Sequence, residues 1–156
     1  MGLFDKIFSS NSATQQKAGY TPLSDYEAWV AILYTCISVD GDVSDVEIDV
    51  MMRLLIYKNK FADIEIIPFY KNAMYAKNEF GAQHIIDQSA PLIKEEDRPT
   101  VLALVTELVL SDGILTEKEK ELIEYVTLKL NIDEALASKI IEVTLIKNRD
   151  NRVLVN

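Results

Sequence analysis

Two short segments carry most of the side chains in this sequence that could do chemistry, and both follow one pattern. Residues 38–47 read Ser-Val-Asp-Gly-Asp-Val-Ser-Asp-Val-Glu, and residues 110–119 read Leu-Ser-Asp-Gly-Ile-Leu-Thr-Glu-Lys-Glu. Each reduces to Asp-Gly-x-apolar-Ser/Thr-acid-x-Glu. Carboxylate oxygens are the hard ligands that divalent cations take in proteins. The pattern therefore predicts a site for a divalent cation of unspecified identity, built from Asp40, Glu47, Asp112 and Glu119, with Asp42 and Asp45 adding negative charge.

The same acids also have a structural interpretation. The Gly can end one helix in the left-handed conformation, and Ser44 or Thr116 can cap the helix that follows. Glu47 or Glu119, three residues later, would then close a capping box. In that case the acids hold helix ends and the protein is a metal-free structural adaptor. The spacing leaves both interpretations open.

Familiar metal and catalytic motifs do not fit these segments. An EF-hand loop that starts at Asp40 would need Gly and Glu where the sequence has Asp45 and Met51. A di-iron carboxylate bundle needs Glu-x-x-His on two helices, but the single His84 has Gly81 at that spacing. The sequence has no Ser-His-Asp set, Gly-rich phosphate loop or zinc spacing. A metal-dependent hydrolase would have only carboxylates to act as nucleophile or base, so we expect no enzymatic activity.

Periodic apolar residues predict helices on both sides of each segment. Ser24 begins the first main helix, and Glu27 would close a capping box there. Its expected core stripe is Trp29, Ile32, Leu33, Cys36 and Ile37. Further helices are expected near Ser44, Pro68, Pro99, Thr116 and Asp133, with a break at Gly81. We expect a single compact all-α bundle of about seven or eight helices with two pseudo-symmetric helical hairpins. The apolar stripes continue into the four acids, so these should point toward the mouth of the core, where their repulsion must be offset.

The chain is expected to form one main domain. Residues 1–20 read as a short amphipathic segment and a polar linker, residues 21–148 as the helical domain, and residues 149–156 as a tail. The amphipathic segment would dock on the domain or on a neighbouring copy, which makes a homo-oligomer one expected arrangement. The aromatic residues between positions 69 and 80 are expected in the core, and His84 is expected to be a surface or packing residue.

Composition narrows the classes of partner. The net charge of −9 and the pI of about 4.6 disfavour nucleic acid and anionic lipid and favour cations or basic protein surfaces. The apolar runs are too short to span a membrane, so no direct membrane insertion is expected. A single cysteine, Cys36, excludes an internal disulfide, suits a reducing cytoplasm and is expected to be buried.

With its two Asp-Gly-x-x-Ser/Thr-x-x-Glu segments, the sequence resembles the TerB family, which is associated with tellurite resistance. The same fold occurs at the N-terminus of a membrane-linked DnaJ-like co-chaperone. The opening Gly-Leu-Phe-Asp-Lys-Ile-Phe is similar to the Phe-Phe-Asp-Lys start of such proteins, and the resemblance spans approximately residues 1–133.

The resemblance implies an all-helical, cytoplasmic, non-enzymatic domain that binds metal through acidic clusters. It also implies protein partners in a membrane-associated stress-response complex. The family's acidic positions fall on Asp40, Glu47, Asp112 and Glu119, with Asp42, Asp45 and Glu117 secondary. The second segment has Ile114 where the first has Asp42, so two equal metal sites are not expected.

Overall fold

The computed structural model describes residues 19–39 and 41–152 of the 156-residue chain. The predicted amphipathic segment at residues 3–8 and the side chain of Asp40 therefore lie outside the described residues. Six α-helices are present, namely α2 (Asp25–Ile37), α3 (Asp45–Ile56), α4 (Ile67–Ser89), α5 (Arg98–Val109), α6 (Glu117–Lys129) and α7 (Glu134–Lys147). Three short 3-10 helices connect them, namely η2 (Asn59–Phe61), η3 (Ala90–Leu92) and η4 (Glu95–Asp97).

The prediction of an all-α fold is confirmed, since the described part of the chain forms helices and no strand. The six helices fall slightly below the predicted seven or eight. One reason is that α4 continues through Gly81, where a separate helix was expected. Gly81 nevertheless has φ 83° and ψ 169°, a conformation that divides α4 into two helical halves and that favours glycine.

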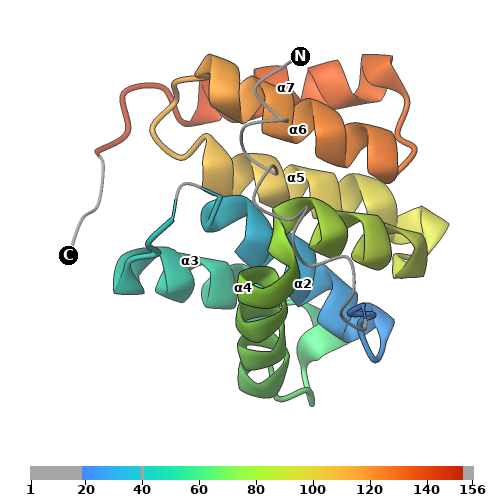
Figure 1. Cartoon of the computed structure of the whole chain (residues 1–156). Helices are drawn as coiled ribbons and strands as arrows, with labels where there is room; N and C mark the ends of the chain where they lie inside the picture. Colours follow the sequence, from blue (N-terminus) through green and yellow to red (C-terminus); the bar gives the residue numbers. More distant parts are fainter. Residues whose placement is uncertain (1–18, 40, 153–156) are drawn as a thin grey trace.

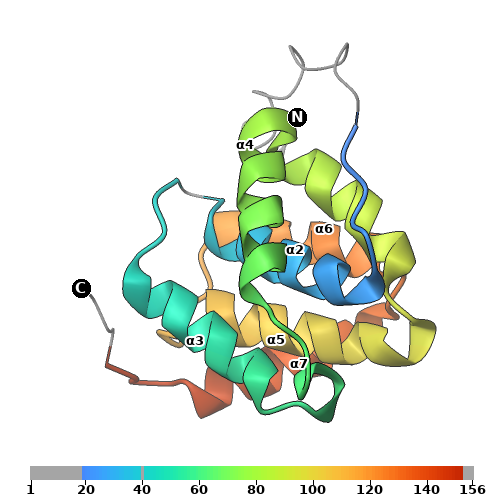
Figure 2. The same ribbon diagram turned by 90° about the horizontal axis from the view of Figure 1, so that it is seen from below.

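Helix α2 is the centre of the fold. All residues from Glu27 to Cys36 are buried, and the helix packs mainly against α4 and α5 (Figures 1 and 2). A helix that is apolar around its whole circumference is stable only when other elements surround it. The predicted core stripe is correct from Trp29 to Cys36, whereas Ile37 is half-buried. Burial also raises the pKa of the Cys36 thiol to about 12.

An ion pair fixes the N-terminal end of α2. The Lys60 ammonium of η2 lies 2.5 Å from the Asp25 carboxylate and 4.3 Å from the centroid of the Tyr26 ring. Burial acts to raise the pKa of Asp25, but the hydrogen bond and charge of Lys60, aided by Lys94 at 4.0 Å, outweigh it and lower that pKa. This pair joins η2 to the end of α2 that is remote from residues 38–44.

The C-terminal helices form a second layer. Helices α6 and α7 both pack on α5, and the upper part of Figure 1 shows them together on that side. Helix α6 also meets the second half of α4, where the Tyr125 hydroxyl donates to the Asp87 carboxylate. None of the helices in the described residues is long and apolar enough to cross a membrane.

Candidate functional site

We name residues 38–44 the first elbow, because they join α2 to α3. Helix α2 ends at Ser38, Gly41 has φ 115°, and Ser44 caps α3. The Ser44 hydroxyl accepts from the Glu47 amide at 3.1 Å, and the Glu47 carboxylate accepts from the Ser44 amide at 3.0 Å. These two reciprocal hydrogen bonds are the predicted capping box.

A lysine ties the first elbow to α4. The Lys77 ammonium donates to the Ser38 carbonyl oxygen at 2.9 Å, and burial lowers the pKa of Lys77. A carbonyl at a helix C-terminus is the negative end of the helix dipole, so an ammonium there is favourable. The contact fixes the start of the elbow and leaves its far side exposed.

The second elbow, residues 110–116, joins α5 to α6 and also contains a glycine with positive φ and a capping residue. Gly113 has φ 77°, and the Asp112 carboxylate accepts from the Ile114 amide at 3.0 Å. The Thr116 hydroxyl accepts from the Glu119 amide at 3.2 Å, and the Glu119 carboxylate accepts from the Thr116 amide at 3.1 Å. The second predicted capping box is therefore also present.

The end of α7 lies directly against the second elbow. A Cβ atom on Gly113 would lie 2.5 Å from the Asn148 carbonyl oxygen and 2.9 Å from the Arg149 Cα. The Asn151 amide nitrogen donates to the Ser111 carbonyl at 3.2 Å. The described part of the expected tail thus packs on the elbow, and Gly113 is required for close approach as well as for its backbone conformation.

The structure shows where the predicted acids lie. Figures 1 and 2 place both elbows at the same end of the molecule, on the left in each view. Asp42 and Glu47 are exposed, whereas Asp112 and Glu119 are half-buried. Within residues 19–39 and 41–152, no group of three or more His, Cys, Asp or Glu side chains could hold a metal. Because Asp40 is one of the four predicted ligands and lies outside those ranges, the metal site stays a prediction.

The predicted position is correct for His84 and wrong for Tyr75. His84 is half-buried, and its Nε2 accepts from the Tyr20 amide at 2.9 Å, so it packs as expected. Tyr75 was expected in the core with the neighbouring aromatic residues, but its side chain is 74% exposed. That expectation was wrong because Tyr75 lies on the outer side of α4, whereas Ala73 and Ala76 face the core.

The prediction that Glu27 closes a capping box with Ser24 is only partly correct. The Ser24 hydroxyl accepts from the Glu27 amide at 3.3 Å, as a cap should. The Glu27 carboxylate does not return to Ser24; it accepts from the Tyr20 hydroxyl at 2.6 Å and from the Asn72 amide at 3.0 Å. The third capping box is therefore only half formed, and a buried carboxylate faces α4 instead.

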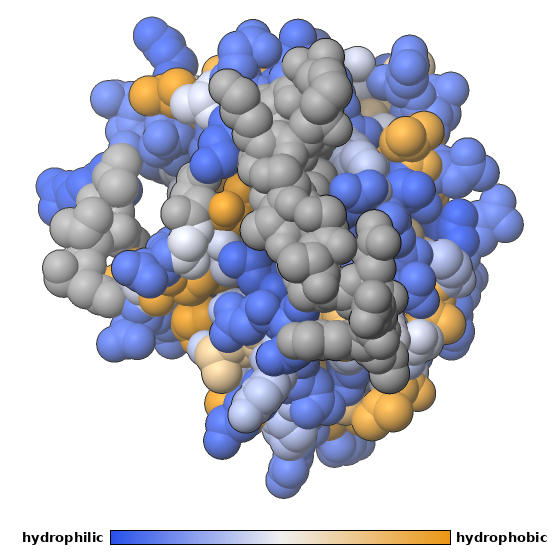
Figure 3. All heavy atoms as spheres, in the orientation of Figure 1, coloured by the Kyte–Doolittle hydropathy of each residue, from blue (hydrophilic) through white to orange (hydrophobic). Residues whose placement is uncertain are grey.

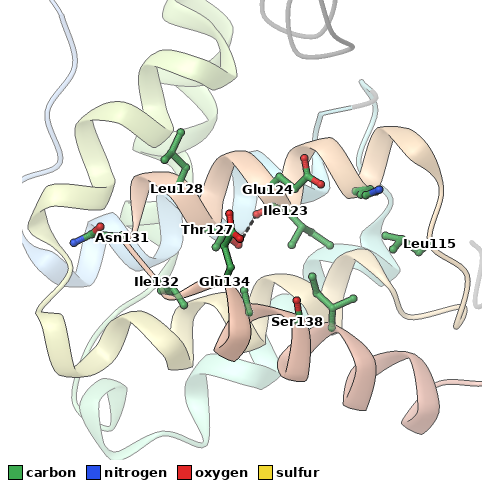
Figure 4. Close-up of a pocket in the computed structure, with 12 residues that line it drawn as sticks. Leu115, Ile123, Glu124, Thr127, Leu128, Asn131, Ile132, Glu134 and Ser138 are labelled. Atoms are coloured by element: carbon green, nitrogen blue, oxygen red, sulfur yellow. Dashed lines mark hydrogen bonds between the residues drawn. The ribbon is translucent and has the colours of Figure 1, made fainter.

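A groove between α6 and α7 was not predicted. It has a volume of about 570 Å³, and Figure 4 shows Ile123 and Thr127 of α6 across from Ser138 of α7. Ile132 and Leu115 lie toward its two ends. Leu128, which lines the groove, is 70% exposed. The signal available in the sequence was Leu128 itself, an apolar residue outside the α6 core stripe.

Residues 26–140 match the family described as Tellurite resistance protein TerB. The chain belongs to the TerB family. The match includes both elbows and most of the groove, and it extends seven residues beyond the expected limit at residue 133 (140 − 133 = 7). It begins at residue 26, so the opening segment that resembles the start of such proteins lies outside it. No curated protein and no solved structure matches the chain.

Proposed function

We propose that this TerB-family protein is a non-enzymatic module of a cytoplasmic response to tellurite or other chemical stress. It acts by binding a protein partner, which belongs to a membrane-associated complex, in the groove between α6 and α7. The single observation that supports the binding surface is the apolar lining of this groove, in which Leu128 is 70% exposed and Ile132 and Ile141 are half-buried. The family match supports the tellurite context.

The groove has the shape and lining of a helix-binding surface. Its length follows α6 and α7, which pack on α5 and leave the space between them unfilled. Ile123, Ile132 and Ile141 supply apolar side chains, and Lys120, Glu124 and Glu134 supply charges. Amphipathic helices bind such grooves through apolar anchors at i, i+3, i+4 and i+7.

The negative charge of the protein favours a basic amphipathic helix as the partner. Its net charge is −9, and Glu124 and Glu134 line the groove together with one lysine. A basic partner is attracted at long range by an acidic protein. The expected occupant is therefore an amphipathic helix with apolar anchors and Lys or Arg on its flanks. Figure 3 shows another face of the molecule, where apolar residues are interspersed among hydrophilic ones.

A pair of matched variants tests the groove. Leu128→Glu places a charge in the lining, whereas Ile67→Glu makes the same kind of change at a 53% exposed position on α4. We expect Leu128→Glu to lower survival in tellurite about tenfold or more, as for loss of an interface anchor, and Ile67→Glu to have little effect. Circular dichroism would verify that both variants fold. Equal survival of the two variants would exclude the groove, and wild-type protein that confers no protection would exclude the stress role.

A synthetic peptide gives a direct binding measurement. A helical peptide with Leu at i, i+3, i+4 and i+7 and Lys on its flanks should bind wild-type protein by fluorescence anisotropy. Leu128→Glu should weaken this binding about tenfold, which corresponds to about 1.4 kcal/mol. An acidic-flanked peptide of the same apolar pattern serves as the control. Stronger binding of the acidic peptide would contradict the proposed charge preference.

The second candidate function is divalent-cation binding at the first elbow. Asp42, Asp45 and Glu47 are exposed, and no basic side chain is described in contact with them among residues 19–39 and 41–152. The nearby Asp49 already pairs with Arg53 at 3.0 Å. These three carboxylates do not form a group that could hold a metal by themselves, so the proposed site needs Asp40 as a further ligand, and a bound cation would offset the repulsion between the acids.

Calorimetric titration with Ca²⁺, Mg²⁺, Mn²⁺ and Zn²⁺ tests the cation. We expect the double variant Asp40→Asn, Asp42→Asn to weaken binding about tenfold, because two anionic oxygen ligands become neutral. Asp63→Asn is the matched control, because Asp63 is exposed and lies outside both elbows, and it should change affinity less than about twofold. If none of the four ions gave binding heat with wild-type protein, the proposal of cation binding would be rejected, and the acids would be explained by helix capping alone.

A further inference from the structure

A second hollow lies beside the break in α4, well apart in sequence from both elbows and from the groove. Its volume is about 380 Å³, and it is bounded by the chain before α2, by α2 itself and by the first half of α4. The side chains that matter for its chemistry are Tyr20, Glu27, Asn72, Tyr75, Glu79 and Phe80. Three of these are aromatic and two are acidic, and none of the described residues that line the hollow is a lysine, arginine or histidine.

The floor of the hollow carries a buried negative charge. Glu27 is only 1% exposed, and its two carboxylate oxygens accept from the Tyr20 hydroxyl at 2.6 Å and from the Asn72 amide at 3.0 Å. Both donors are neutral, and in the described residues no ion pair is formed by Glu27. A buried carboxylate with neutral partners only is electrostatically unfavourable relative to one that also faces a cation.

The Tyr20 hydroxyl provides a further hydrogen-bond acceptor for a ligand in the hollow. Burial and the hydrogen bond to Glu27 raise the pKa of Tyr20, so its proton remains in place and is donated to the carboxylate. A hydroxyl that donates to an anion becomes a better acceptor at its own oxygen. Tyr20 can therefore accept from an N–H donor in the hollow while it continues to satisfy Glu27.

Aromatic rings form the walls. Tyr75 is 74% exposed and has no packing role that requires its ring, while Phe80 presents one face to His84 at a centroid distance of 4.9 Å. The faces of aromatic rings are negative and attract cations, most of all organic ammonium groups. Metal ions prefer clustered oxygen ligands without rings, so this lining fits an organic cation better than an inorganic one.

We propose that the hollow binds an alkylammonium group, with the aromatic rings around its carbon atoms and with Glu27 and the Tyr20 oxygen around its charge. The group comes either from a free diamine or from the lysine side chain of a protein. This site is separate from the groove between α6 and α7, so it does not depend on the proposed partner helix. Glu27 provides charge from the floor, and the exposed Tyr75 provides a ring that closes over the ligand.

The test uses the full chain and small probes followed by NMR chemical shifts of residues near His84. Putrescine and Nα-acetyl-lysine amide should shift these signals in a saturable manner, whereas the neutral isostere of the amine, 1-pentanol, should not. Tyr75→Ala should weaken binding about fivefold or more, the order expected for one cation–π contact. Tyr57→Ala is the matched control, because Tyr57 is 84% exposed and lies at the end of α3.

Glu27→Gln separates charge from shape. The variant keeps a side chain of the same size and should weaken binding of both amines about tenfold. Circular dichroism verifies that Glu27→Gln is folded. If Glu27→Gln unfolds, the affinity of Tyr75→Ala for the amines tests the proposal instead. Tighter binding of putrescine identifies a free diamine, and tighter binding of the lysine derivative identifies a protein side chain. Equal binding of 1-pentanol, unchanged affinity in Tyr75→Ala, or no shift with either amine would overturn the proposal. Leu128→Glu should leave amine binding unchanged, which distinguishes failure of this site from failure of the groove.

Discussion

The two elbows have nearly the same sequence pattern and the same caps, but they differ in what surrounds them. Position 41 has open space around the place where a Cβ would lie, whereas the same atom on Gly113 would collide with the backbone of Asn148 and Arg149. The first elbow contacts α4 through Lys77, and Asp42 within it is exposed to solvent. The second is covered by the end of α7 and by Asn151.

This difference shows that one repeated motif can have two different surroundings. Capping requires only residues three positions apart, so both copies retain it. Enclosure by another helix is a property of the second copy alone, and it makes that copy a structural joint. The first copy remains accessible, and its exposed carboxylates are the ones available to a ligand. Stability measurements on variants of the two elbows test this contrast, and a variant outside them serves as a reference.

The largest expected effect is at Gly113. Gly113→Ala should lower the free energy of unfolding by about 3–5 kcal/mol, because a positive φ costs about 1–2 kcal/mol and the backbone collision adds overpacking strain. Gly41→Ala should cost only the conformational part, about 1–2 kcal/mol. Urea denaturation of both variants measures the difference. Equal losses would mean that the end of α7 does not constrain the second elbow.

An intermediate effect is expected at Asp25, which lies outside both elbows. Asp25→Asn should lower the free energy of unfolding at pH 7 by about 1.5–3 kcal/mol, since it removes a charged hydrogen bond with Lys60. The pKa of Asp25 is lowered in the folded protein, so this stability is present above its ordinary pKa and is lost as pH falls through the lower folded value. Urea denaturation at pH 7 and pH 2.5 should therefore show a difference that shrinks in acid. If the loss of unfolding free energy in Asp25→Asn were the same at both pH values, the ion pair with Lys60 would be excluded as its cause. Variants in the two elbows should not show this decrease of the loss in acid.

The smallest expected effect concerns the caps. Ser44→Ala and Thr116→Ala should each lower the free energy of unfolding by about 1 kcal/mol, because each removes one hydroxyl that accepts a helix amide. The two losses should agree within about 0.5 kcal/mol, since the capping geometry is the same in both elbows. A much larger loss at Thr116 would show that the end of α7 depends on that cap.

Much of the fold followed from local pattern. The buried stripe of α2, the caps at Ser44, Thr116 and Asp133, and the break at Gly81 each depend on residues within one or two helical turns. The expectation for Tyr75 failed because one apolar run did not reveal which side of α4 would be covered. Glu47 was expected to point toward the mouth of the core, but it is exposed, because its cap holds the carboxylate at the helix end and away from the core.

The helices, their ends and the duplicated pattern can be read from the sequence, because these arise from hydrogen bonds between near neighbours and from the helical period. The contact of Asn148 with Gly113, the hydrogen bond from Asn72 to Glu27 and the packing of both α6 and α7 on α5 are visible only in the folded molecule. Those contacts join residues far apart in the chain, and their partners are selected by packing of the whole core. The same local motif therefore became an enclosed joint in one place and an open loop in the other.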